Sequence, residues 1–188
     1  MQADLTWIQY IMRKLPNEMP LSSPEPLDIE WWGDASTSFG IGVAVGTFWG
    51  VWRWTTEMRV GPRQEYDIGW AEAVAVELGL HMAIYHGLIA SRPTNRNAIL
   101  VRSDNMGIAT VINKGRSRSR KTNIVLKHIY ELCTAQRIHL IAQHVPGRLN
   151  ISDVLSRGDI ATFLKAFPNI STQTSVPIPH HLALQLTL

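Results

Sequence analysis

The stretch that decides the fold is residues 33–45, GDASTSFGIGVAV, in which Asp34 stands just ahead of a run of alternating large and small residues. Large apolar side chains occupy every second position from Phe39 to Val45, and glycine or alanine occupies the positions between them. This period of two predicts a β-strand with one bulky face and one nearly bare face. We predict that strand over residues 39–49, and the segment before it, residues 29–35, is predicted as a strand that carries Asp34.

Further along the chain the pattern predicts a mixed α/β domain. Residues 51–58 would complete a three-stranded antiparallel meander. The period then changes to that of a helix over residues 68–90, with Asp67 as its N-cap. The remaining predicted elements are a strand at 98–103, helices at 105–113 and 122–136, a strand at 138–144 and a last helix at 151–167 with Asn150 as its N-cap. The predicted order is therefore β-β-β-α-β-α-α-β-α.

Length and composition are those of one globular domain with a short extension at each end. The chain has 188 residues, of which 45% are hydrophobic and 18% charged. We predict an N-terminal extension at residues 1–27, made of an amphipathic stretch and a proline-rich linker, and a core domain at residues 28–168. Residues 169–188 contain no Asp, Glu, Lys or Arg and are predicted as a tail that is ordered only if it packs on something.

Several classes of protein are excluded at this stage. No window of the sequence approaches the roughly 20 apolar residues of a membrane span. In the N-terminal segment the basic residues follow the apolar ones, whereas in a signal peptide they precede them. We therefore expect an intracellular protein, cytoplasmic or nuclear, that does not enter a membrane. The single cysteine, Cys133, allows no internal disulfide and no thiolate zinc site, so any metal ion must be held by oxygen or imidazole.

Acidic residues are few, and their positions are informative. Asp34 lies within the first predicted strand, Asp104 ends the fourth strand and Asp153 lies in the first turn of the last helix. If the first and fourth strands are parallel neighbours joined by a crossover helix, Asp34 and Asp104 lie side by side. Two carboxylates that close repel each other unless a divalent cation lies between them. On the crossover helix Glu72 would face the sheet, while Glu77, about 140° away, would face solvent or a side pocket.

Each of the three aspartates also has an ordinary structural role open to it. Asp34 could be a turn residue at the end of a strand, and Asp104 could be the N-cap of the following helix. Asp153 could be a capping-turn acid, since free amides and the helix dipole favour its ionised form there. The carboxylates therefore favour a metal site without excluding these simpler interpretations.

Four motifs follow one another along the chain: GDASTSFGIGVAV (33–45), IGWAEAVAVELGL (68–80), VRSDNMGIATVINKGRSRS (101–119) and HVPGRLNISDVLSRGD (144–159). Together, in this order, they resemble the ribonuclease H domain attached to reverse transcriptases of retroelements, particularly the DIRS-like and gypsy-like groups. The resemblance covers roughly residues 29–168. It implies the ribonuclease H-like fold, a five-stranded mixed sheet whose first three strands are antiparallel and whose other two are parallel to the first, with helices on both faces.

The same resemblance implies a site and an activity. Asp34, Glu72, Asp104 and Asp153 match the four acids of the family, and His144 matches its mobile histidine, although His144 could equally be a plain loop residue. A site of oxygen ligands suits two Mg²⁺ ions, with Mn²⁺ as an alternative. The implied reaction is hydrolysis of the RNA strand of an RNA–DNA hybrid in the reverse transcription of a retroelement. The polymerase domain of a reverse transcriptase polyprotein is then an expected partner.

Two alternatives to that activity stay open. One is a catalytically silent nucleic-acid-binding or connection module of the same fold, which the retention of all four acids disfavours. The other is a two-metal nuclease of this fold that acts on DNA, such as a transposase or resolvase. The glutamate on the first helix and the HVPG…NISD ending favour ribonuclease H over this second alternative.

Contacts to nucleic acid are expected beside the acids. Ser36 follows Asp34 and could bind a 2′-hydroxyl group, although turn formation explains it equally well, and Asn105 follows Asp104. The net charge is only +3, but between Asp104 and Glu131 the chain has six basic residues and no acid. Five of these could grip the hybrid backbone, namely Lys114, Arg116, Arg118, Arg120 and Lys121. A solvated face or an import signal would give the same run of charge.

Overall fold

The computed structural model describes residues 2–14, 25–89, 97–174 and 176–188 of the chain. Its strands are β1 (Leu27–Ala35), β2 (Gly40–Val45), β3 (Phe48–Trp54), β4 (Asn97–Ser103), β5 (Ile138–His144), β6 (Thr172–Gln173) and β7 (Leu186–Thr187). Its α-helices are α1 (Gln2–Lys14), α2 (Ile68–Tyr85), α3 (Met106–Lys114), α4 (Arg120–Gln136), α5 (Asp153–Ser156) and α6 (Ile160–Ala166). There are also two short 3₁₀-helices, η1 (Gly147–Leu149) and η2 (His180–Leu182).

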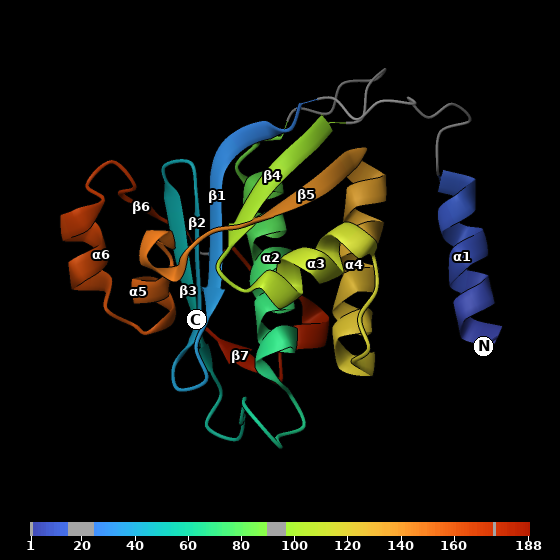
Figure 1. Cartoon of the computed structure of the whole chain (residues 1–188), viewed down its shortest axis with the longest axis horizontal. Helices are drawn as coiled ribbons and strands as arrows, with labels where there is room; N and C mark the ends of the chain where they lie inside the picture. The colour runs from blue at the N-terminus through green and yellow to red at the C-terminus, as the bar shows by residue number, and fades with distance from the viewer. Residues whose placement is uncertain (1, 15–24, 90–96, 175) are drawn as a thin grey trace.

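All strands belong to one mixed sheet of order β5-β4-β1-β2-β3-β6, and β7 also pairs with β3. Strands β1, β2 and β3 form an antiparallel meander, whereas β4 is parallel to β1 and β5 is parallel to β4. Figure 1 shows α2, α3 and α4 on one side of this sheet and α5 and α6 on the other. The predicted α/β fold class is confirmed as a mixed sheet between helices, with three antiparallel strands followed by two strands parallel to the first.

The two faces of β2 explain how helices approach the sheet from both sides. The large residues Ile41 and Val43 are fully buried in the main core, on the side of α2. Gly42 faces the other way, and a Cβ atom there would lie 2.5 Å from both Leu155 Cβ and Ser156 N of α5. The bare face predicted from the sequence is therefore the surface on which α5 lies in close contact.

Helix α2 lies against the opposite face of the sheet for a similar reason. Asp67 caps its first turn, as predicted, because the Asp67 carboxylate accepts a hydrogen bond from Trp70 N at 2.8 Å. Gly79 lies so close to the indole of Trp31 that an added Cβ would be 2.2 Å from Nε1. This contact turns the face that carries Glu72 and Gly79 toward β1.

Several predicted boundaries were wrong. The strand predicted over 39–49 ends at Val45 because Gly46 adopts a positive φ of 59° and turns the chain, so that β3 begins at Phe48 and ends at Trp54. The last helix is two helices, because Gly158 has a φ of 81° between α5 and α6. Asn150 is not its N-cap, since α5 begins at Asp153 after Ser152. Helix α2 ends at Tyr85. Residues 15–24 and 90–96, which include most of the predicted proline-rich linker and the last residue of the helix predicted over 68–90, lie outside the described residues.

Both ends of the chain add to the predicted core. Strand β6 pairs in parallel with the beginning of β3 and β7 pairs antiparallel with its end, so the sheet has two short strands more than the five expected. Between them Val176 and Leu182 are buried in the main core. At the other end of the chain, α1 lies beside α4 (Figure 1), where Trp7 Nε1 donates to Glu131 Oε1 at 2.8 Å. No described helix is long and apolar enough to cross a membrane.

Candidate active site

Parallel pairing of β1 with β4 brings two aspartates together at one end of the sheet. Trp32 pairs with Arg102, and Asp34 and Asp104 each lie two residues beyond that pair along the chain. Glu72 reaches the same point from the first turns of α2. The structure places one carboxylate oxygen from each of Asp34, Glu72 and Asp104 within 4.8 Å of the others. Three of the four acids singled out in the sequence therefore form one cluster.

Burial and mutual repulsion change the acidity of two of these carboxyl groups. Asp34 is 6% exposed and Glu72 is 4% exposed. Burial raises the pKa of Asp34 to about 7, and repulsion from Asp104 and Asp153 adds to this effect, while a hydrogen bond from Ser156 opposes it. Burial, with repulsion from Asp34 and Asp104, raises the pKa of Glu72 to about 9. The cluster is therefore a place where a cation would be strongly stabilised.

The donor set of this cluster fits a hard divalent cation. Carboxylate oxygens are the ligands preferred by Mg²⁺ and Mn²⁺, and the three acids offer oxygens from three different elements. Asp34, Glu72 and Asp104 are thus the residues that could hold such ions. A cation bound among them would also offset the repulsion that raises the pKa of Asp34 and Glu72.

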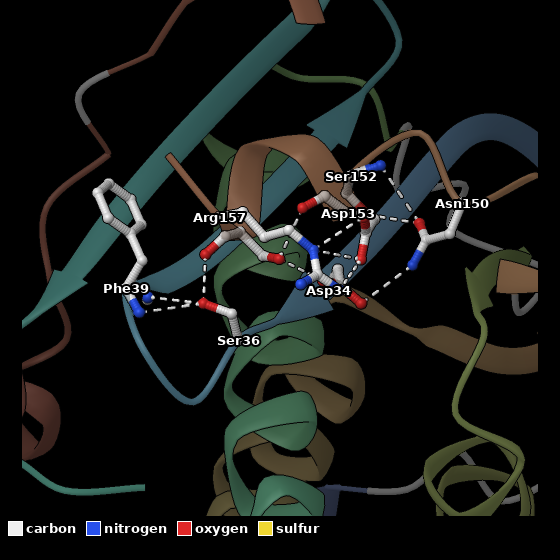
Figure 2. A network of polar contacts seen from close by, with 9 residues as sticks. Asp34, Ser36, Phe39, Asn150, Ser152, Asp153 and Arg157 are labelled. Carbon is white, nitrogen blue, oxygen red and sulfur yellow. Dashed lines mark hydrogen bonds and ion pairs between the residues drawn. The ribbon is translucent and has the colours of Figure 1, made fainter. Parts of the chain in front are cut away.

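Two neighbours that the sequence analysis did not identify as site residues hold the carboxylate of Asp34 (Figure 2). Asn150 Nδ2 donates to Asp34 Oδ1 at 3.1 Å, and the hydroxyl of Ser156 donates to Asp34 Oδ2. Asn150 is itself fixed, because its Oδ1 accepts a 2.7 Å hydrogen bond from Ser152 Oγ. Asn150 was noticed only as a helix cap. The signal that could have identified both residues is their place in the HVPGRLNISDVLSRGD motif.

Asp153 lies near this cluster but outside it. It is the first residue of α5, not the third helical residue predicted from the sequence. Its negative charge contributes to the raised pKa of Asp34. Its carboxylate is bound by Arg157, whose Nε lies 3.0 Å from both oxygens and whose Nη2 lies 2.8 Å from Oδ1 (Figure 2). The structure therefore shows Asp153 paired with a cation of its own helix.

The end of β5 and the turn after it lie against Asp104. His144 pairs with Ser103 in the sheet, and its Nε2 lies 3.1 Å from the backbone oxygen of Asp104. His144 is exposed. In the turn that follows, a Cβ atom at Gly147 would lie 3.0 Å from Asp104 Oδ2, so a larger residue would crowd that carboxylate. Gly147 was not among the site residues predicted from the sequence.

The side chains of Ser36 and Asn105 both have structural partners. The hydroxyl of Ser36 donates to the backbone oxygen of Ser156 and accepts hydrogen bonds from the backbone of Phe39 and Gly40 (Figure 2). Asn105 is the N-cap of α3, and its Oδ1 accepts from the amides of Gly107 and Ile108. These contacts bear out the turn chemistry that was open for Ser36, and contact with nucleic acid stays a prediction for both.

The five basic residues at 114–121 have different surroundings. Three of them, Arg116, Arg118 and Arg120, line a hollow of about 750 Å³ together with Trp7 of α1. Lys121 lies 2.5 Å from Glu65 Oε1 and over the ring of Tyr66. Lys114 is an exposed residue at the end of α3. Of the five basic residues, the three arginines are therefore the ones that line this hollow.

No family model and no curated protein matches the chain. Among solved structures, the chain is similar to an RNase H1, LC11-RNase H1, isolated from compost by a metagenomic approach. The two share 18% sequence identity over 71% of this chain and 94% of the other, with a TM-score of 0.46.

Proposed function

We propose that this domain is a metal-dependent ribonuclease H, which hydrolyses the RNA strand of RNA–DNA hybrids. The observation that carries the proposal is the cluster of Asp34, Glu72 and Asp104, two of which are almost completely buried. Clustered buried carboxylates are costly to a fold unless they bind a cation or a proton. The sequence motifs that contain these acids, quoted above, resemble those of retroelement ribonuclease H domains.

The acids would hold two Mg²⁺ ions, with Mn²⁺ as an alternative. Two divalent ions in such a site supply positive charge to the attacking and leaving oxygens of a phosphodiester. Asp34, Glu72 and Asp104 would bind these ions, and Asn150 and Ser156 keep Asp34 in one orientation. Asp153 would join them once its carboxylate is released from Arg157.

His144 is proposed as the group that holds or moves a proton during the reaction. It is exposed and lies beside the backbone of Asp104, so a substrate at the acids could contact its ring. Histidine can take up and release a proton near neutral pH, which suits this role. Arg116, Arg118 and Arg120 are proposed to bind the phosphates of the hybrid, with Lys114, Lys121, Ser36 and Asn105 as further contacts.

The biological setting is proposed from the resemblance alone. The motifs favour a domain of a retroelement reverse transcriptase, which would act inside the cell beside the polymerase domain of the same polyprotein. A silent nucleic-acid-binding module and a nuclease that acts on DNA remain the alternatives. The acid cluster favours an active nuclease over a silent module, because a module that only binds nucleic acid gains nothing from buried carboxylates.

One assay separates these possibilities. The protein is incubated with Mg²⁺ and four end-labelled substrates of one sequence: an RNA–DNA hybrid, single-stranded RNA, double-stranded RNA and double-stranded DNA. We expect cleavage of the RNA strand of the hybrid and of nothing else. Cleavage of DNA would support the DNA nuclease, and binding of the hybrid without any cleavage would support the silent module.

A further inference from the structure

A second group of ionisable side chains surrounds Glu77 on α2, away from the acids described above. Glu77 is fully buried. Its Oε1 lies 3.0 Å from Nε2 of His181 in η2, 3.8 Å from Nδ1 of His128 in α4 and 4.0 Å from Nε2 of His81 one turn along α2. Three segments far apart in the sequence therefore meet at one buried carboxylate.

Two buried polar atoms of this group have no hydrogen-bond partner among the described residues. Among the described residues, Glu77 Oε1 accepts no hydrogen bond despite its 3.0 Å distance from His181 Nε2, which donates to the other oxygen, Oε2, at 3.2 Å. The Nδ1 atom of His128 is also buried and has no hydrogen-bond partner in the part of the chain that the structure describes. An unpaired carboxylate oxygen with no exposed surface is costly, and such groups normally have a partner. These two atoms, Glu77 Oε1 and His128 Nδ1, lie 3.8 Å apart.

The histidines are suited to bind a metal ion in their neutral form. The rings of His128 and His181 have centroids only 3.7 Å apart, which disfavours a positive charge on both. Burial lowers the pKa of His81 and of His128, and the neighbouring histidines lower it further, although Glu77 opposes this. A neutral imidazole is the form that binds metal.

The geometry of the group is close to that of a zinc site. One ligand atom from each of Glu77, His128 and His181 lies within 4.8 Å of the other two. Zinc lies about 2.0 to 2.2 Å from imidazole nitrogens and carboxylate oxygens, so neighbouring ligands of a tetrahedral ion are about 3.3 Å apart. The distances of 3.0 and 3.8 Å from Glu77 Oε1 lie on either side of that value. Imidazole ligands also favour zinc over Mg²⁺, which prefers oxygen.

We propose that Glu77, His128 and His181 bind one Zn²⁺ ion. This site is separate from the proposed catalytic one. The ion would connect η2 of the C-terminal segment to α2 and α4. It would act next to Leu182, the buried neighbour of His181, and so strengthen an attachment that apolar contacts, the short strands β6 and β7 and side-chain hydrogen bonds, such as that from Thr55 Oγ1 to Leu184 O, also support.

The test measures Zn²⁺ binding by the full chain that carries Asp104→Asn, so that the catalytic acids contribute little, in the presence of excess Mg²⁺. We expect one Zn²⁺ per chain by calorimetry, and a melting temperature that rises with the Zn²⁺ concentration because the ion binds only the folded state. Adding His181→Ala or His128→Ala should abolish both effects. The matched control is His180→Ala, which removes the exposed neighbouring histidine and should leave both effects in place.

Binding of Co²⁺ gives a second measurement, which would not depend on His128 and His181 if these residues only stabilised the fold. Bound by imidazole and carboxylate in place of zinc, it should give a visible absorption band that is lost in the His181→Ala and His128→Ala chains and kept in the His180→Ala chain. Circular dichroism of the metal-free proteins should be the same for all of them, since His128 and His181 keep 29% and 31% of their side chains exposed. Absence of Zn²⁺ binding, or binding that survives both substitutions, would overturn the proposal.

Discussion

Asp34 illustrates how a single residue is prepared for its proposed role. Its carboxylate is buried, lies beside two other acids and accepts hydrogen bonds from Asn150 and Ser156. Hydrogen bonds that fix the orientation of a metal-binding carboxylate typically matter 10- to 100-fold for metal affinity or activity. Asn150 and Ser156 are therefore as much part of the site as the acids themselves.

The raised pKa of Glu72 predicts how the metal-free protein responds to pH. Its carboxyl group binds a proton more tightly in the folded state, with a pKa raised from 4.5 to about 9. The stability that this proton contributes is fully present below pH 4.5 and is lost as the pH rises through 9. With a chelator present, the urea midpoint should fall between pH 5 and 9, and it should fall less steeply in the Glu72→Gln chain. Equal slopes in the two proteins would contradict the assignment.

At the scale of elements, the glycines of β2 decide how close α5 can lie. Gly42→Ala places a methyl group 2.5 Å from Leu155 Cβ and Ser156 N, so α5 must move away from the sheet. We expect a loss of about 1 to 3 kcal/mol in the free energy of unfolding, together with a loss of hybrid cleavage, because Ser156 moves with α5. Chemical denaturation and the cleavage assay measure the two effects.

The matched control is Gly33→Ala in the neighbouring strand β1. There the added methyl group would lie 3.5 Å from Ala75 Cβ, which is an ordinary contact distance. This variant should keep its stability to within about 0.5 kcal/mol, the usual range of a substitution without a clash. A Gly42→Ala chain as stable and active as the Gly33→Ala chain would show that α5 does not depend on the bare face of β2.

The loop between α3 and α4 is predicted to bind phosphates. Replacing Arg116, Arg118 and Arg120 with serine should weaken hybrid binding and flatten its dependence on salt, by about 0.7 to 0.9 units of log–log slope for each phosphate that the protein no longer neutralises. The replacement Lys165→Ser, on the exposed surface of α6 across the sheet, is the control and should leave the slope unchanged. Binding measured by fluorescence anisotropy at several salt concentrations tests this, and an unchanged slope in the triple variant would refute it.

The local sequence predicted which helices and strands form better than it predicted where they end. Strand β5 was predicted with its actual boundaries and the cap of α2 with its actual residue, because the periodicity of apolar residues and helix capping are local properties. The cap of α3 is Asn105, one residue after Asp104, the cap that the sequence offered. The turn at Gly46 and the break at Gly158 were missed, since a glycine within a periodic run does not reveal whether it will adopt a positive φ. Asn150 was misassigned for a related reason, because its partner, Asp34, is 116 residues away.

At the scale of the whole molecule, the C-terminal segment is part of the same core as the predicted domain. Strands β6 and β7 have two residues each, and a sequence pattern cannot reveal strands so short. They exist because the outer edge of β3 offers unpaired backbone groups that the returning chain can bind. The cluster at Glu77 was likewise hidden, because it depends on His181 folding back onto α2. From the sequence, Glu77 was expected to face either solvent or a side pocket.

Two leucines test whether this segment stabilises the molecule. Leu182 is 2% exposed in the main core, whereas Leu184, two residues later, is 85% exposed. Leu182→Ala should lower the free energy of unfolding by about 2 to 5 kcal/mol, and Leu184→Ala should change it by less than about 0.5 kcal/mol. Equal effects in a urea titration would mean that the segment does not pack as described.

The central claim is that the carboxylates at the ends of β1 and β4 form the active site of a ribonuclease H. The most direct test is the rate of RNA-strand cleavage in an RNA–DNA hybrid, measured against Mg²⁺ concentration for three proteins. The unchanged protein and the Asp159→Asn control should be equally active, because asparagine caps α6 as well as the exposed Asp159 does. Asp104→Asn should be slower by a thousandfold or more, equivalent to about 4 kcal/mol of lost transition-state stabilisation. Cleavage that needs no divalent cation, or that survives in Asp104→Asn, would contradict the claim.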